Sequence, residues 1–154
     1  MSEVARILNQ LDRSYHGESW HGPSLRDLVE GITAKDAAAH PVHGAHSIWE
    51  LVNHVAAWNS IVRRRLAGEA VEVTPDADWP PVWEATDVAW KRSLEVLDDC
   101  RAHLRGDTEK LHDTHLNETP ENQKHSRYIM LHGLVQHDLY HAGQIAILKK
   151  ALGR

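Results

Sequence analysis

Apolar residues recur at intervals of three and four positions in four long stretches of the chain, as they do in helices that bury one face. The apolar face of the first stretch consists of Val4, Ile7, Leu8 and Leu11. Gly17 closes this helix, because glycine readily adopts the backbone conformation that follows a helix end. The residues up to position 46 are mostly polar and predict only short helical turns, at 24–29 and 33–39.

The second helix has the clearest beginning. Ser47 and Glu50 match a capping box, in which each side chain binds a backbone N–H that the first helical turn leaves without a partner. The helix is predicted to run to Gly68, with an apolar face of Ile48, Leu51, Val52, Val55, Val62 and Leu66. Residues 69–81 then form a connection with three prolines. It is longer than most connections, so we expect it to cross the domain or to cover a site.

Two more helices complete the predicted fold. The third is expected over residues 82–104, ending at Gly106, and the fourth over residues 125–151, stopping at Gly153. Apart from residues 71–73, no stretch has the pattern of a β-strand. We therefore predict an all-α protein in which residues 1–154 form one domain, a four-helix bundle with a long connection between its second and third helices.

Composition and charge exclude several classes of protein. The formal net charge of −5 argues against binding to nucleic acid or to an anionic membrane through a basic face. Cys100 is the only cysteine, which excludes a disulfide framework and fits a reducing compartment. No stretch approaches the ~18 apolar residues of a membrane span, and residues 1–10 lack the apolar centre of a signal peptide. We expect a cytoplasmic protein.

Thirteen histidines are the unusual feature of this sequence, and His137 and His141 are the one pair separated by four positions. Both lie within the apolar face of the fourth helix, which consists of Met130, Leu134, His137, His141, Ile145 and Leu148. Burying two imidazoles is costly unless their ring nitrogens find partners. Because side chains four positions apart lie on one face, both rings could bind one metal ion. The alternative is a pair of core histidines that hydrogen-bond to a neighbouring helix.

A metal site in a helical bundle needs ligands from facing helices, and His54 is the third candidate. It lies at the edge of the apolar face of the second helix, where it either faces an adjacent helix or is packed and half-exposed. His132 projects to the face opposite His137, which excludes it from the same site. Three further histidines lie in a polar loop that is expected to be solvated: His40, His43 and His46.

Two segments, SIWELVNH at 47–54 and HDLYHAGQI at 137–145, together resemble the DinB/YfiT-like superfamily of metal-dependent enzymes. The family pattern is one histidine on the second helix and H-x-x-x-H on the last, often followed by a small residue, glycine and glutamine. The capping box and the long middle connection also agree, so the resemblance covers nearly the whole chain. It implies an up-down-down-up four-helix bundle, with His54, His137 and His141 as the three metal ligands.

The resemblance also implies a chemistry. Relatives commonly carry nickel or zinc, many form homodimers, and characterised members include transferases and isomerases that use a low-molecular-weight thiol. We therefore expect an enzyme that acts on small molecules as a thiol S-transferase does, with a nickel or zinc ion as cofactor and a thiol as possible co-substrate. Two alternatives stay open: a hydrolase with a metal-activated water, and a non-catalytic metal-binding or dimeric stress-response module. A three-histidine site suits thiol and water activation alike.

No catalytic residue is predicted, but three side chains near the histidines could support the site. Glu50 is expected to cap its helix, or else to serve as a general base. Asp138 either orients a ring nitrogen or faces solvent or a second subunit, and Gln144 bonds a ligand or a neighbouring helix. Cys100 lacks the basic surroundings that would make it a nucleophile. Four tryptophans could line a pocket, although most are expected in the core because the chain has no phenylalanine: Trp58, Trp79, Trp83 and Trp90.

Overall fold

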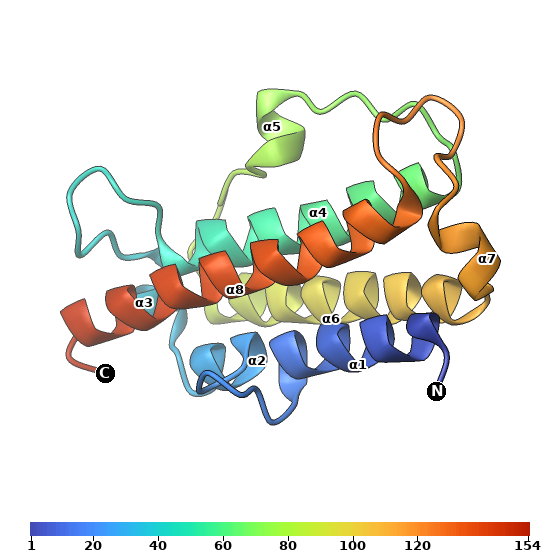
Figure 1. The fold of residues 1–154 in the computed structure, drawn as a ribbon. Helices are drawn as coiled ribbons and strands as arrows, with labels where there is room; N and C mark the ends of the chain where they lie inside the picture. The colour runs from blue at the N-terminus through green and yellow to red at the C-terminus, as the bar shows by residue number, and fades with distance from the viewer.

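The computed structural model describes residues 1–154 as helices joined by loops, without a strand, which confirms the predicted all-α class. Four long helices lie side by side (Figure 1): α1 (Glu3–His16), α4 (Ile48–Leu66), α6 (Asp87–Glu109) and α8 (Arg127–Ala151). Four short helices lie between them in the chain: α2 (Leu25–Val29), α3 (Ala34–Ala38), α5 (Pro75–Asp78) and α7 (Asp113–Leu116). None of the helices combines the length and the apolar character that crossing a bilayer requires.

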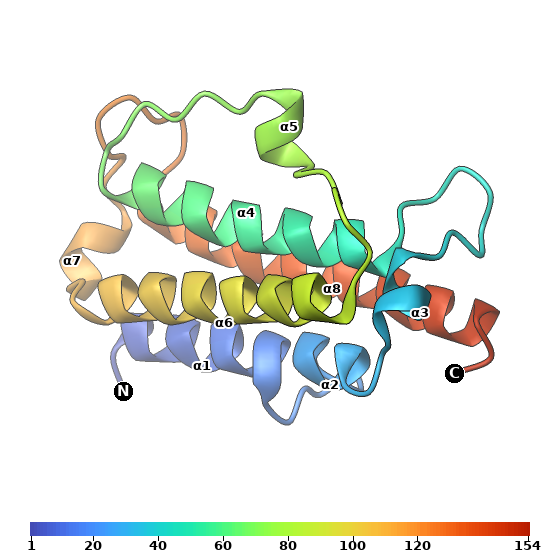
Figure 2. The same cartoon turned by 180° about the vertical axis from the view of Figure 1, so that it is seen from behind.

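Each long helix packs against two of the others. α4 contacts α6 and α8, and α1 contacts the same two helices from the opposite side. In Figure 1 the colours run from right to left along α1 and α8 and from left to right along α4 and α6. Figure 2 shows α6 beside α4 from behind, with α5 standing apart from the four long helices, above α4. The segment between α4 and α6 therefore runs over the outside of α4.

Side chains cap the beginnings of all four long helices. The capping hydroxyls belong to Ser2, Ser47, Thr86 and Ser126. The predicted capping box is confirmed, since the Ser47 N–H donates to Glu50 Oε2 at 2.7 Å and the Glu50 N–H to Ser47 Oγ at 3.1 Å. Gly68, with a φ of 90°, follows the end of α4. Such a φ favours glycine, which explains why the helix stops there.

The predicted limits of the third helix were wrong at both ends. α6 begins at Asp87, because Thr86 caps it and the segment before Thr86 contains two adjacent prolines and forms no helix. Trp83, assigned to the buried side of that helix, is 89% exposed. At the other end α6 continues through Gly106, at a cost of roughly 1 kcal/mol in helix propensity, because the buried Leu104 and Thr108 hold both flanking turns in the core.

The buried core consists of two apolar clusters. One contains residues of α2, α3, the first half of α4 and the last turns of α8, and the other contains residues of α1, the end of α4 and the first turns of α8. Buried polar side chains lie between them along the long helices, among them Ser14, His54, Arg101, Asp138 and His141. Polar groups in such a position require internal partners, because water does not reach them.

Asp138 and Arg101 form an ion pair inside the bundle. The guanidinium of Arg101 bonds the carboxylate of Asp138, and the Ser14 hydroxyl donates to the same carboxylate oxygen at 3.1 Å. Arg101 also lies over the Tyr15 ring, 4.8 Å from its centroid. Burial raises the pKa of the Asp138 carboxyl, and the Arg101 guanidinium opposes this shift. The expectations for Asp138 were wrong: its carboxylate neither faces solvent nor bonds a ring nitrogen, because it points from α8 toward α1 and α6.

Replacing Asp138 by alanine is expected to lower the free energy of unfolding by about 3–5 kcal/mol, because it leaves the Arg101 charge buried without a partner. The double variant Arg101→Met/Asp138→Leu removes both charges. Its free energy of unfolding is expected to fall by less than that of Asp138→Ala. Urea denaturation measures both. The control is Arg105→Ala, which breaks an ion pair with Asp12 at the surface and should cost about 1 kcal/mol or less. Equal losses in Asp138→Ala and Arg105→Ala would show that the buried pair does not stabilise the bundle.

Candidate metal centre

Three histidines meet where α4 packs against α8. His137 Nε2 lies 3.0 Å from His54 Nε2 and 3.1 Å from His141 Nε2. The nearest ring nitrogens of the three residues all lie within 4.8 Å of one another, as they would around one metal ion. The structure thus brings together the three histidines that the sequence singled out.

The helices explain this convergence. His137 and His141 are one turn apart on α8, and the buried Leu134 and Ile145 continue the same face on either side of them. His54 enters from α4 and is only 5% exposed. Because His54 lies at the edge of the apolar face, the sequence allowed its side chain to be half-exposed. In the structure, the connection that precedes α6 covers it.

The outer ring nitrogens of two histidines are held by oxygen atoms. His54 Nδ1 donates to the backbone carbonyl of Asp78 at 2.6 Å, and His141 Nδ1 donates to Gln144 Oε1 at 2.6 Å. Because each oxygen accepts a proton from Nδ1, each neutral ring carries its hydrogen there and has a lone pair on Nε2. Gln144 therefore bonds a candidate ligand, which is one of the two roles that the sequence left open.

His137 cannot supply the hydrogens that the Nε2 atoms of both His54 and His141 lack. His137 Nδ1 is buried without a hydrogen-bond partner, and His137 Nε2 can carry one proton at most. That proton can be donated fully to only one neighbouring Nε2, so the lone pair of the other Nε2 has no donor of its own. A divalent metal ion held by His54, His137 and His141 would accept the lone pairs of all three Nε2 atoms. The donor set fits a divalent ion.

Electrostatics keep the rings neutral. Burial lowers the pKa of His137 to about 3, and the neighbouring His141, His54 and Arg101 lower it in the same direction. Burial also lowers the pKa of His54 and of His141, although Asp78 and Gln144 respectively oppose these shifts. Neutral imidazole is the form that binds metal ions. The rings are therefore ready to act as ligands at pH 7 without losing a proton.

The long connection between α4 and α6 covers the three histidines. Covering a site was one of the two roles expected for this connection. The Trp79 indole stacks on the His54 imidazole, with ring centroids 3.8 Å apart and planes inclined by 11°. His46 stacks on the same indole at 3.6 Å and 9°, so the indole lies between two imidazoles. Trp58 Nε1 donates to Asp78 Oδ1 at 2.8 Å and fixes α5 over α4. These contacts hold His54 and limit the access of water from that side.

The other candidates lie outside the centre. Glu50 caps α4, and its Oε2 also lies 3.2 Å from His40 Nε2 and 3.3 Å from His46 Nδ1. Burial would raise the pKa of Glu50, but the Ser47 N–H and the two histidines lower it overall. The three loop histidines are exposed, as expected, but His40 and His46 also hold the loop to the start of α4 through Glu50. His132 packs on Tyr128, away from the triad, as its projection indicated.

Asp78 is a contributor that the sequence did not reveal, and for Trp79 the sequence indicated only a pocket or core position, without its contact to His54. They lie in and just after α5, a helix of four residues that has no periodic pattern. The only signals were the length of the connection and the tryptophan before its paired prolines. Neither signal indicates which helix the segment contacts, because that depends on how the bundle is assembled.

The family model described as the DinB superfamily matches residues 19–145, which is most of the chain. The matched span includes the three histidines together with Asp78 and Gln144. No curated protein and no solved structure matches the chain.

The low pKa of His137 predicts how the stability of the metal-free protein depends on pH. The imidazole titrates near 6.5 in an unfolded chain and at about 3 in the folded protein. Between these values only the unfolded state binds the proton, so the free energy of unfolding should fall as the pH drops from 7 to 4. Urea denaturation in EDTA at several pH values measures this. His137→Leu should remove about one proton from the dependence; an unchanged dependence would contradict the assignment.

Proposed function

The chain belongs to the DinB superfamily, and we propose that it is a metal-dependent enzyme in which His54, His137 and His141 bind one divalent ion. One observation carries the proposal: two of the three rings have their hydrogens fixed on Nδ1, and all three Nε2 atoms converge. Nickel and zinc are the ions proposed, because imidazole ligands suit both. The opposite runs of the α1/α8 and α4/α6 pairs support an up-down-down-up four-helix bundle, proposed as one domain over residues 1–154.

Three protein ligands would leave at least one coordination position for a substrate. When bound, the ion would supply positive charge that lowers the pKa of a coordinated thiol or water. The chain itself orients the ligands: Asp78 and Gln144 hold two rings by their outer nitrogens, and the Trp58 and Trp79 indoles form an apolar wall beside them. Such an arrangement suits a small substrate that must be kept partly away from water.

Thiol transfer is favoured over hydrolysis by the absence of a carboxylate that could act as general base. Only the three histidines make up the group of candidate ligands, and no Asp or Glu joins it. Asp78 lies on the Nδ1 side of His54, Glu50 caps α4, and Asp138 bonds Arg101. Hydrolases commonly place a base beside the metal-bound water to assist its attack, whereas a metal-bound thiol that has lost its proton to solvent is already the nucleophile. A low-molecular-weight thiol is therefore the proposed co-substrate.

We also propose that the protein works in the cytoplasm as a homodimer. The lone Cys100, which rules out an intramolecular disulfide, supports the location. Tyr140 and Ile147, two turns apart on the outer side of α8, are 67% and 64% exposed and support a self-association surface.

Metal binding can be tested by calorimetric titration with nickel or zinc. The chain as isolated, after treatment with EDTA and removal of the chelator, is expected to bind one ion and to melt at a higher temperature when loaded, because the ion binds only the folded state. His137→Ala should weaken the affinity about a hundredfold or more and remove the thermal shift. His132→Ala, on the same helix but outside the triad, should bind as the unaltered chain does. Equal effects of the two substitutions would refute the proposed ligands.

Thiol use can be tested by spectroscopy of the nickel- or cobalt-loaded protein. A low-molecular-weight thiol that enters the open position should produce a charge-transfer band, because thiolate sulfur donates electron density to such ions. An equal concentration of the corresponding alcohol serves as the control and should produce none. If neither thiols nor small anions change the spectrum, the proposal of an enzyme is rejected in favour of a non-catalytic metal-binding module.

A further inference from the structure

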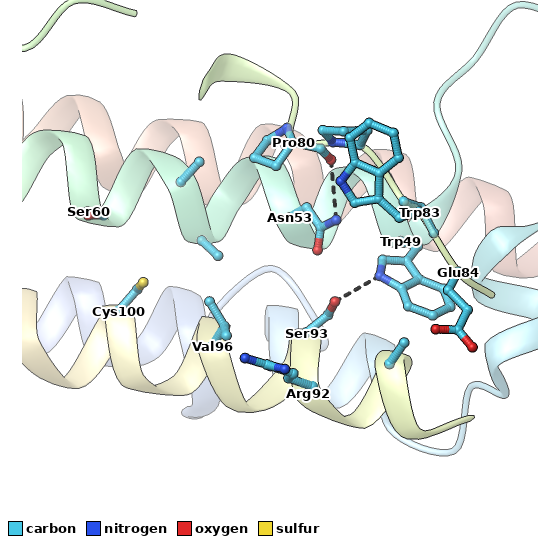
Figure 3. A pocket seen from close by; sticks show the side chains of 15 residues that line it. Trp49, Asn53, Ser60, Pro80, Trp83, Glu84, Arg92, Ser93, Val96 and Cys100 are labelled. Atoms are coloured by element: carbon cyan, nitrogen blue, oxygen red, sulfur yellow. Dashed lines mark hydrogen bonds between the residues drawn. The ribbon is translucent and has the colours of Figure 1, made fainter. Parts of the chain in front are cut away.

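A second cavity of about 450 Å³ lies between α4 and α6, beneath residues 80–84 (Figure 3). None of the three central histidines lines it. Its volume lies within the range of small-molecule sites, which are about 300–1,000 Å³. Its walls are largely apolar and include Trp49, Ala57, Pro80, Val82, Trp83 and Val96.

The large apolar surfaces of this cavity are open to solvent. Trp83 is 89% exposed at the rim, and Val96 on α6 is 46% exposed. Trp49, by contrast, is 2% exposed and its Nε1 already donates to Ser93 Oγ at 2.8 Å, so it contributes only an apolar edge to the floor of the cavity. Burial raises the pKa of the Cys100 thiol, which lines the cavity as a neutral group. Removing such surfaces from water by a bound apolar group is favourable.

Arg92 is the one cationic residue that lines the cavity. Of the eleven arginines in the chain, it is the only one without a hydrogen bond, an ion pair or an aromatic partner. Figure 3 shows its side chain lying along the cavity toward Val96. The neighbouring Lys91, by contrast, has Glu95 within 3.9 Å. A guanidinium with five free donors beside an apolar wall suits a carboxylate, which it can bind by two parallel hydrogen bonds.

We propose that this cavity binds a small apolar monocarboxylate, with the carboxylate on Arg92 and the aromatic or aliphatic body between Trp49, Trp83 and Val96. Glu84 also lines the cavity and makes no ion pair. Its negative charge disfavours ligands with two carboxylates, so the site is selective for a single negative charge. The proposal is independent of the metal centre, because no lining residue is one of the proposed ligands.

Titration of the metal-free protein in EDTA with 2-naphthoate tests the site, because a carboxylate could otherwise bind a metal ion. The neutral isostere 2-naphthamide is titrated in parallel. Naphthoate is expected to bind about tenfold more tightly than the amide, the gain of one charge-assisted contact. In ¹H–¹⁵N spectra it should shift the indole N–H of Trp83, assigned with Trp83→Phe.

Three variants separate the possible outcomes. Arg92→Gln should raise the Kd of naphthoate to that of the amide, whereas Lys91→Gln, which removes the adjacent cation outside the cavity, should leave it unchanged. Ala57→Trp should fill the cavity and abolish both titrations. The proposal is overturned if naphthoate does not bind, if it binds no better than the amide, or if Arg92→Gln and Lys91→Gln have the same effect. Thermal melting checks that each variant is folded.

Discussion

Three imidazole nitrogens face one another inside this bundle with too few protons to satisfy them. Asp78 and Gln144 hold the hydrogens of His54 and His141 on the outer nitrogens, so the inner nitrogens present lone pairs. Uncompensated polar atoms in a buried site cost free energy of about 1–3 kcal/mol each. The arrangement spans two separate helices, and a shared cation would resolve it. The proposed chemistry depends on that convergence.

The rest of the bundle is arranged so that α8 can carry polar groups at its centre. His137 and His141 face α4, while Asp138, the residue after His137, points about 100° around the helix and pairs with Arg101 of α6. One turn of α8 thus presents a candidate metal centre toward α4 and a buried ion pair toward α1 and α6. The apolar clusters at the two ends of the bundle supply the hydrophobic stabilisation that this polar centre does not.

The sequence predicted those parts of the structure that local chemistry determines. Ser47 and Glu50 identified the start of α4, and the spacing of His137 and His141 within an apolar face identified their common side. Asp138 was misjudged because an angle around one helix does not reveal how many neighbours the helix has. The start of α6 was misplaced because Trp83 continues the apolar spacing although it lies in the rim of a cavity. The roles of Asp78 and Trp79 depend on a long-range contact, which no local pattern encodes.

X-ray absorption spectroscopy of the nickel- or zinc-loaded protein tests the central claim most directly. It reports the number and type of atoms around the ion without requiring a substrate. The account predicts three imidazole nitrogens at about 2.0–2.1 Å, completed by light atoms from solvent. A sulfur neighbour from Cys100, or fewer than three imidazoles around the ion, would contradict it.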